Sequence, residues 1–179
     1  GPPALGLNEP NTKEIIVIEL SSYQLDLTLN ATFDIAVFLN ISPDHLDRHG
    51  DMNGYFSAKR QIFRNRQNVI KSQFAVIGID EEYGRSLYSE MSARDSWTVY
   101  PISISKNLSD GFYAENGSLY KQSSTYICDL NKAPNLPGIH NWQNAAAAAA
   151  VGHALGIKSD IIADAITNYP GLPHRMENL

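Results

Sequence analysis

The sequence predicts an α/β fold in which a mainly parallel β-sheet is flanked by helices and carries a small β-hairpin. Two observations support this fold class. Short continuous runs of apolar residues, rich in Ile and Val, alternate with segments of helical periodicity, which is the pattern of parallel strands joined by helices. An Asn116-Gly117 pair separates two segments of alternating polarity, which is typical of a two-residue hairpin turn.

Several segments have the character of β-strands. Continuous apolar runs predict buried parallel strands at residues 14–20, 34–40 and 73–79. Alternating apolar and polar residues predict a further strand at 97–105 and the hairpin over 112–130. Ligands of such sheets bind at the carboxyl ends of the strands, so the residues that follow the first two strands are the best candidates for chemistry.

Other segments have helical periodicity, with apolar residues three or four positions apart. These segments span residues 51–66, 80–94, 140–155 and 158–168. Gly156 follows the third of them and is the expected C-terminal cap. Strands and helices therefore alternate through most of the chain, as the fold class requires.

Composition excludes several classes of partner. The 179 residues, enough for one domain with its own core, include 14 basic and 19 acidic side chains and no basic run, so we expect no nucleic-acid partner. Cys128 is the single cysteine, which excludes an internal disulfide and suits a reducing cytosol. The apolar run at 145–151 is too short to cross a bilayer, and no secretory leader pattern occurs. We therefore expect a cytoplasmic protein without membrane insertion.

Lys59 occupies an unusual position for a lysine. It falls in the middle of an apolar helical stripe formed by Met52, Tyr55, Phe56, Ile62 and Phe63. A buried ammonium needs a partner anion or chemical modification. Three interpretations are open: the stem is buried while the ammonium reaches water, the ammonium binds phosphate, or the amine adds CO2 to become a carbamate that ligates a metal.

A cluster of acids and imidazoles follows the second predicted strand. Asp44, His45, Asp47 and His49 lie within six residues. His45 is a candidate metal ligand, with Asp44 or Asp47 in support. Alternatively, a short helix begins at Pro43-Asp44 and the charges are solvated. The position of His49 before a glycine favours a loop residue.

Polar residues at two further places are candidates for ligand binding. Glu19 ends the first predicted strand. It is a possible Mg²⁺ ligand, because this ion binds few protein oxygens and takes its other ligands from phosphates and water. Alternatively, Glu19 caps the next turn. Asn141 and Asn144 open a predicted helix on one face. Asn side chains can pair with the edge of adenine, whereas simple N-capping explains one of the two.

Five motifs, taken in order, resemble the Mur ligases, the ADP-forming amino-acid ligases of peptidoglycan synthesis, and among them the D-glutamate-adding members most. The motifs are E-L-S-S-Y-Q-L at 19–25, N-I-S-P-D-H-L-D-R at 40–48, Y-F-S-A-K at 55–59, G-I-H-N-W-Q-N-A at 138–145 and G-L-P-H-R-M-E at 171–177. Together they extend over nearly the whole chain.

The resemblance implies a role for each matching residue. Glu19 would bind the Mg²⁺ shared with the ATP phosphates, and His45 with carbamylated Lys59 would hold a second Mg²⁺ as the catalytic pair. The remaining roles are binding roles: Ser21, Gln24 and Arg48 for the UDP-muramoyl substrate, Asn141 and Asn144 for adenine, and Arg175 for the ribose or phosphates.

The implied reaction has two steps. ATP phosphorylates the terminal carboxylate of UDP-N-acetylmuramoyl-L-alanine, and the amine of D-glutamate then displaces phosphate to form an amide. Two cations suit this reaction, because a carboxylate and a triphosphate must approach each other. The resemblance further implies a monomeric enzyme of the bacterial cytoplasm.

The chain departs from the family pattern in one respect. No G-x-x-x-x-G-K-[ST] phosphate loop occurs in it. We therefore expect residues 1–170 to form a partial central ATP-binding domain without the phosphate-loop strand and helix. Residues 171–179 would be a linker and the start of a C-terminal ligase domain. Such a fragment would be inactive alone, and its exposed apolar edge would favour self-association.

Other functions fit parts of the pattern. A different Mur ligase or a ligase like folylpolyglutamate synthase would use the same chemistry on another substrate. A metal-dependent hydrolase would use Asp44, His45, Asp47 and His49 as ligands. A non-catalytic α/β binding module would leave Lys59 and the asparagine pair without a chemical role.

Overall fold

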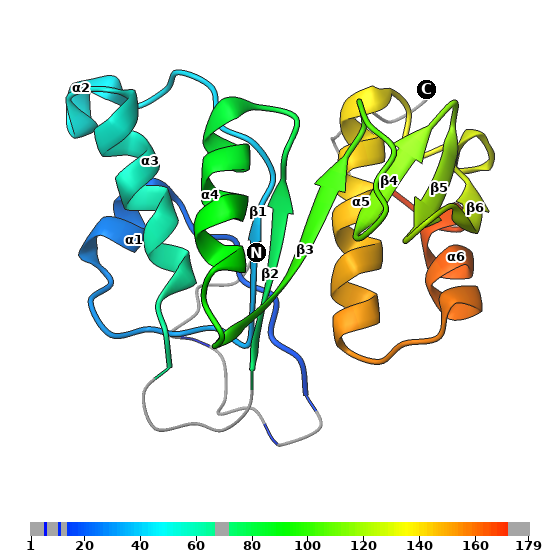
Figure 1. Ribbon diagram of the computed structural model, residues 1–179, viewed down its shortest axis with the longest axis horizontal. Helices are drawn as coiled ribbons and strands as arrows, with labels where there is room; N and C mark the ends of the chain where they lie inside the picture. Colours follow the sequence, from blue (N-terminus) through cyan, green and yellow to red (C-terminus); the bar gives the residue numbers. More distant parts are fainter. Residues whose placement is uncertain (1–5, 7–10, 12–13, 67–71, 172–179) are drawn as a thin grey trace.

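The computed structural model describes residues 6, 11, 14–66 and 72–171 of the chain (Figure 1). Six strands form one sheet in the order of the sequence: β1 (Ile35–Phe38), β2 (Gln73–Gly78), β3 (Trp97–Ser103), β4 (Phe112–Glu115), β5 (Ser118–Lys121) and β6 (Thr125–Asp129). The pairings from β1 to β4 are parallel, and β4, β5 and β6 form an antiparallel meander. The predicted α/β fold, with a mainly parallel sheet and a hairpin, is confirmed.

Helices connect and cover these strands. They are α1 (Ser22–Leu27), α2 (Leu46–His49), α3 (Met52–Arg60), α4 (Glu82–Ser92), α5 (Ile139–Ala154) and α6 (Ser159–Thr167), with 3₁₀ turns η2 (Gln61–Phe63) and η3 (Leu130–Lys132). The helices predicted at 80–94, 140–155 and 158–168 are confirmed to within two residues. The segment predicted at 51–66 is α3 followed by η2, and α1 was not predicted.

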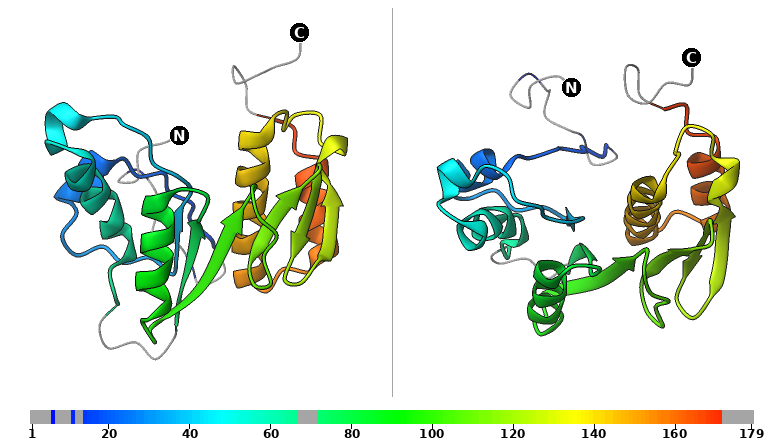
Figure 2. Two further views of the ribbon diagram at one scale, coloured as in Figure 1. Left: turned by 45° about the horizontal axis from the view of Figure 1, so that its top comes forward. Right: turned by 90° about the horizontal axis from the view of Figure 1, so that it is seen from above.

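The sheet separates two apolar cores. Successive residues of a strand face opposite sides, and in β2 Ala75 and Ile77 pack with the side chains of α3 and α4, whereas Val76 packs with α5 and α6. Figure 2 shows α4 and α5 on opposite faces of the sheet. Helices of both layers therefore begin near the carboxyl ends of β1, β2 and β3.

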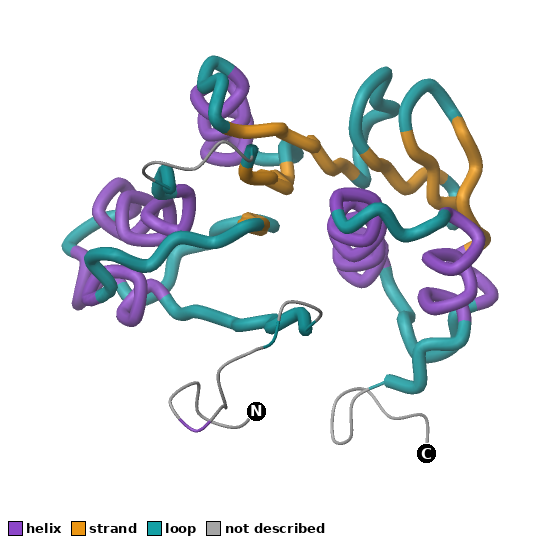
Figure 3. The backbone as a smooth tube through the Cα atoms, turned by 90° about the horizontal axis from the view of Figure 1, so that it is seen from below, coloured by secondary structure: helices purple, strands orange, loops and turns teal. Residues whose placement is uncertain are grey.

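The strand predicted at residues 14–20 is wrong. This segment is extended but forms no ladder, and Figure 3 shows it as a loop on the side of β1 that faces away from β2. Ile15, Ile16, Val17 and Ile18 are 63%, 41%, 90% and 43% exposed. An apolar run forms a strand only where a neighbouring strand and a packing surface receive it. Among the described residues β1 pairs only with β2, so the expected exposed apolar edge is present.

Two turn predictions are confirmed by backbone geometry. Asn116 and Gly117 have φ values of 50° and 78°, as a type I′ turn requires at both central positions. Gly156 directly follows Leu155, the C-terminal cap residue of α5, and has a φ of 76°. This is the left-handed conformation in which helices commonly end. Within the described ranges, no helix combines the length and apolar character needed to cross a bilayer.

Candidate functional site

His45 stands in a strained turn beyond the carboxyl end of β1. Its φ of 53° is in the left-handed region, which costs a non-glycine residue about 1 kcal/mol. Asp44 holds this turn: its Oδ1 accepts a hydrogen bond of 2.8 Å from the His45 backbone N–H, and its Oδ2 lies 3.4 Å from His45 Nε2. The predicted support of His45 by Asp44 is therefore present, although a short helix, α2, also begins at the next residue.

Tyrosine rings join His45 to the neighbouring helices. Tyr23 of α1 lies 5.0 Å from the His45 ring and 5.6 Å from the His49 ring, measured between ring centroids. Tyr55 of α3 lies 5.9 Å from the His45 ring and 5.5 Å from the His49 ring. His49 Nε2 is also 3.0 Å from Ser22 Oγ. The expectation that His49 is a loop residue is wrong: it belongs to α2 and links α1 with α3.

Lys59 reaches the same cluster from α3. Its Nζ lies 5.1 Å from the centroid of the Tyr55 ring, close enough for a cation–π contact. Tyr55, Ala58 and Phe63 are buried around it, whereas Lys59 itself is half-buried. In the part of the chain that the structure describes, no carboxylate lies within ion-pair distance of this ammonium. Its stem is therefore packed, and its amine lies over the Tyr55 ring that also contacts His45 and His49.

The described residues do not by themselves supply a full set of ligands for a metal ion. Glu19 is exposed and lies in the extended segment just before α1. Among the described residues, no group of three or more His, Cys, Asp or Glu side chains is arranged to hold a metal. The four ligands of a hydrolase site are thus not gathered. One or two carboxylate donors still suit Mg²⁺, which takes its other ligands from phosphates and water.

Ser21 and Gln24 form a capping box at the start of α1. Gln24 Oε1 accepts a hydrogen bond of 2.9 Å from the Ser21 backbone N–H, and the Gln24 N–H donates to Ser21 Oγ at 3.3 Å. This reciprocal cap explains why a helix forms here. Arg48 lies nearby, with its Nη2 3.1 Å from Asp26 Oδ2 and its guanidinium 5.8 Å from the Tyr23 ring. Arg48 thus contacts the Tyr23 ring that also contacts His45, and all three side chains already have a partner.

Asn141 and Asn144 share a face at the start of α5, as expected. Asn144 Nδ2 donates to Asn141 Oδ1 at 3.2 Å, and Asn141 Nδ2 donates to the Pro137 carbonyl at 2.6 Å. Neither caps the helix, because Gly138 holds the cap position without a side-chain bond. Asn141 therefore fixes the loop before α5, and Asn144 is exposed. Arg175, the remaining nucleotide candidate, lies outside the described residues.

Gln143 was missed by the sequence analysis. It is 7% exposed on the alanine-rich face of α5. Its Oε1 accepts a hydrogen bond of 2.7 Å from Asn40 Nδ2, and its Nε2 donates to the Leu39 carbonyl at 3.1 Å. Gly78 permits this approach, since a Cβ there would lie 1.9 Å from the Leu39 oxygen. Gln143 thus ties the asparagine pair to the strand end that leads to His45. In the sequence it is one of three amide residues just before the alanine run, and no spacing distinguished it from Asn141 and Asn144.

Asp80 is a second missed residue, just beyond the carboxyl end of β2. It accepts hydrogen bonds from Ser103 Oγ at 2.5 Å, from the Ile104 N–H at 2.9 Å and from Ser105 Oγ. Burial by itself raises the pKa of Asp80, but the hydrogen bonds from these three residues outweigh burial and hold the pKa below its usual value. An ionised Asp80 therefore fastens the carboxyl ends of β2 and β3 together.

Comparisons with known proteins agree with this arrangement. The family model of the Mur ligase middle domain matches residues 2–152. The chain is 46% identical over 182 residues to the UDP-N-acetylmuramoylalanine–D-glutamate ligase of Caulobacter sp. (strain K31), covering 100% of this chain and 38% of that protein. It is 41% identical to the enzyme of the same name from Rickettsia prowazekii (strain Madrid E), again with 38% of that protein covered. The chain thus spans under two fifths of the length of these relatives.

Solved structures show the same fold. MurF from Acinetobacter baumannii superimposes with a TM-score of 0.57 at 19% identity, covering 84% of this chain and 31% of that one. Since the family model covers most of the chain and the fold matches, this chain belongs to the Mur ligase family and corresponds to its middle domain.

Proposed function

We propose that this chain is the nucleotide-binding middle domain of an ATP-dependent ligase that adds D-glutamate to UDP-N-acetylmuramoyl-L-alanine. One observation carries the proposal: 46% identity along the whole chain to curated relatives named UDP-N-acetylmuramoylalanine–D-glutamate ligase. The proposed enzyme is a monomer of the bacterial cytoplasm and uses ATP with Mg²⁺. The chain alone would not turn over, because it spans only 38% of those relatives.

Binding of ATP is assigned to the start of α5. Asn141 and Asn144 present neighbouring amides on one face, 3.2 Å apart, and amides pair well with the donor and acceptor edge of adenine. Gln143 fixes the position of this face relative to β1 through Leu39 and Asn40. The nucleotide would then lie along the carboxyl ends of the strands, where sheets of this class bind ligands. Arg175 is proposed for the ribose or phosphates.

The phosphorylation of the substrate carboxylate is assigned to the histidine cluster. In this reaction the carboxylate oxygen attacks the γ-phosphorus and ADP leaves. The amine of D-glutamate then attacks the acyl carbon, phosphate leaves, and the amine loses a proton. Magnesium, held by Glu19 and by His45 with Lys59, would neutralise charge between the two anions. The carboxylate of Glu19 fits Mg²⁺, which prefers oxygen ligands, and a carbamate on Lys59 would add a further anionic oxygen donor.

Ser21, Gln24 and Arg48 are proposed to contact the UDP-muramoyl substrate. They belong to the start of α1 and to α2, whose Tyr23 and His49 rings contact each other. Among the described residues, the ion-pair partner of Arg48 is a half-exposed carboxylate, Asp26. A guanidinium in such a pair can exchange its partner for a substrate carboxylate or phosphate at little cost, because exposed ion pairs are worth under about 1 kcal/mol.

The test is phosphate release by the full-length protein that contains this chain. ATP, Mg²⁺ and UDP-N-acetylmuramoyl-L-alanine are supplied, with D-glutamate and meso-diaminopimelate in turn. We expect release with D-glutamate alone. Lys59→Ala should lower the rate about a hundredfold or more, because it removes charge stabilisation at the reacting groups. A small added carboxylic acid should restore part of it if a carbamate is the active form.

Lys132→Ala is the matched control, since Lys132 is an exposed lysine at the end of η3 and should keep full activity. Release with neither amino acid would refute the D-glutamate assignment. Full activity of Lys59→Ala would remove Lys59 from the mechanism, and D-glutamate-dependent release by the 179-residue chain alone would refute its inactivity.

A further inference from the structure

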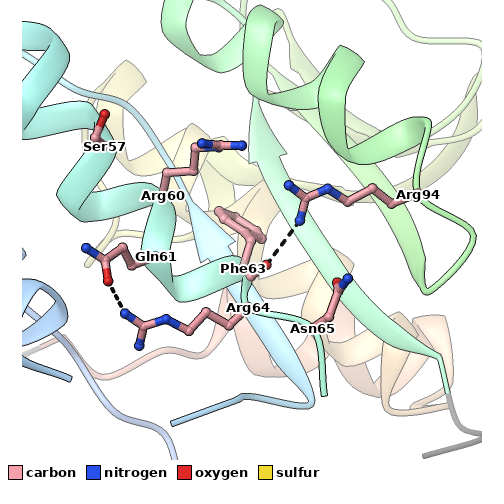
Figure 4. A pocket seen from close by; sticks show the side chains of 7 residues that line it. All are labelled: Ser57, Arg60, Gln61, Phe63, Arg64, Asn65 and Arg94. Atoms are coloured by element: carbon pink, nitrogen blue, oxygen red, sulfur yellow. Dashed lines mark hydrogen bonds between the residues drawn. The ribbon is translucent and has the colours of Figure 1, made fainter. Parts of the chain in front are cut away.

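A second candidate binding site lies at the opposite end of the sheet from His45. A pocket of about 410 Å³ is formed where α3 and η2 end and where the chain passes from α4 into β3. Figure 1 shows α2, next to His45, at the far end of α3 from this position. The lining residues that matter are Ser57, Arg60, Phe63, Arg64, Asn65 and Arg94 (Figure 4). The proposed ligase chemistry uses none of them.

The pocket carries an excess of positive charge. Arg60 and Arg94 both donate to one oxygen of Glu90, so a single carboxylate is shared by two guanidinium groups. The hydrogen bond from Arg60 and the charges of both arginines outweigh partial burial and hold the pKa of Glu90 below its usual value. Arg64 donates instead to neutral oxygens, the Thr28 carbonyl and Gln61 Oε1. Within the described residues, two of the three guanidinium charges are therefore uncompensated.

The polar groups of the pocket that remain free to bind a ligand are hydrogen-bond donors. Figure 4 shows the side chains of Arg60 and Arg94 extending toward each other in front of Phe63. A guanidinium has five N–H donors, and the hydrogen bonds to described residues use one on Arg60 and two on Arg94. Asn65 Oδ1 already accepts from Trp97 Nε1 at 2.7 Å, which leaves its NH₂ group for a ligand. The pocket is thus suited to an acceptor of many hydrogen bonds.

Helix electrostatics explain only part of this arrangement. Arg60 ends α3 and Arg94 follows α4, where cations complement the helix dipole. Arg64 lies after η2 and is bonded to neutral groups at the side of the pocket, so a dipole role does not account for it. Ion pairing likewise leaves positive charge unmatched, because the single carboxylate of Glu90 serves two arginines.

We propose that this pocket binds a small phosphate-bearing anion with at least two negative charges, at a site separate from the ligase chemistry. Guanidinium groups bind phosphate oxygens in pairs and with charge-assisted strength. The volume is of the size that holds small molecules, roughly 300–1,000 Å³. The anion would take over donors of Arg60 and Arg94 from Glu90 and would also engage Arg64 and Asn65.

The test is calorimetric titration of the full-length protein with pyrophosphate, with the nucleotide site first saturated by ADP and Mg²⁺. We expect saturable binding. The double variant Arg60→Gln/Arg64→Gln should weaken it about tenfold or more, because each charge-assisted hydrogen bond contributes well over a factor of five. Glu90→Gln should strengthen binding, since the competing carboxylate is removed. Thermal unfolding of each variant checks that it is folded.

Arg66→Gln is the matched control. Arg66 lies close by in sequence but is paired with Asp34 at 2.9 Å and does not line the pocket, so its replacement should leave the affinity unchanged. Equal affinity in the double variant, or weaker binding in Glu90→Gln, would overturn the proposal. Tighter binding of citrate than of pyrophosphate would overturn the assignment to phosphate. Since binding is measured directly, the result is independent of whether the protein is a D-glutamate ligase.

Discussion

The two faces of the sheet hold their helices in different ways. On the α3 and α4 face the core is made of large side chains, namely Phe38, Tyr55, Phe63, Leu87, Met91 and Trp97. On the α5 face the helix contributes Ala145, Ala146, Ala147, Ala149 and Ala150. Small residues allow a helix to approach the sheet closely, and on this face the Gln143 side chain bonds to the Leu39 carbonyl directly after β1.

This difference extends to the candidate site. His45, His49 and Lys59 all contact tyrosine rings, and such contacts are broad in geometry and individually weak. His45 and His49 also have polar partners close by, Asp44 and Ser22. The asparagine pair is positioned by a buried amide with hydrogen bonds at both ends. We therefore expect the asparagine pair, proposed for nucleotide binding, to depend mainly on close packing. The histidine cluster, proposed for metal binding, should depend more on ring contacts and nearby polar partners. Four measurements test this difference.

Gly78→Ala should have the largest effect on stability. The new Cβ would lie 1.9 Å from the Leu39 oxygen and 2.9 Å from Gln143 Nε2, so the main chain itself must move. We expect the free energy of unfolding, measured by urea denaturation, to fall by about 3 kcal/mol. In the control, Gly152→Ala, the Cβ meets only the flexible end of Ile162 at 2.9 Å in a helix that favours alanine. Equal losses in the two variants would show that close approach is not special to Gly78.

Gln143→Leu should come next. This replacement leaves the Leu39 carbonyl without its hydrogen-bond donor, so the free energy of unfolding should fall by about 2 kcal/mol. Gln73 is the matched control, because it is 3% exposed and donates to the Phe33 and Arg64 carbonyls at 2.8 and 3.1 Å at the other end of the sheet. Both variants should lose similar stability, but only Gln143→Leu should raise the KM for ATP of the full-length protein, by about tenfold. A similar rise in Gln73→Leu would deny Gln143 any positioning role.

Asp80→Asn tests the fastening of β2 to β3. Since the pKa of Asp80 is lower in the folded chain, its carboxylate contributes stability above the usual value of 3.8, and this contribution is lost as pH falls through the lower folded value. We expect Asp80→Asn to cost about 1.5 kcal/mol at neutral pH. The difference from the parent chain should shrink below pH 3.8. A difference that stays constant down to acid unfolding would contradict this account.

Val17→Ser should have the smallest effect on stability. Val17 is 90% exposed, so the free energy of unfolding should change by less than about 0.5 kcal/mol. Self-association of the 179-residue chain, followed by sedimentation velocity, should nevertheless decrease. Tyr126→Ser removes an apolar side chain that is 55% exposed on β6 and should not affect association. If the parent chain sediments only as a monomer, the exposed apolar run does not promote self-association.

Local patterns explain which elements could be predicted from the sequence. The type I′ turn at Asn116-Gly117 and the helical stripe around Lys59 depend on neighbouring residues, and both are present. The run at 14–20 is apolar and continuous, as β2 is, yet it forms no strand, because pairing depends on a partner that no local pattern specifies. Helix α1 was missed since its capping box, Ser21 with Gln24, lies inside a motif that suggested substrate binding instead.

The candidate site shows the same difference between local contacts and contacts made by residues far apart in the sequence. His45 directly precedes α2 and Lys59 lies in α3, the next helix, so their common contact with Tyr55 could be predicted. Gln143 and Asn40 are 103 positions apart, and only the packing of α5 against β1 brings them together. Asp80 and Ser103 are likewise joined by the register of β2 and β3. Contacts of this kind are fixed by tertiary structure and leave no signal in sequence spacing.

The exposed Ile15–Ile18 run has a practical consequence for testing Glu19. Short apolar β-prone segments without charge or proline promote aggregation, and flanking charges suppress it. Glu14 and Glu19 are the charges that border this run. Glu19 would thus be a gatekeeper of colloidal stability as well as a proposed metal ligand. A neutral replacement would lower the yield of soluble enzyme and mimic a catalytic defect, whereas Glu19→Asp keeps the charge and separates the two roles.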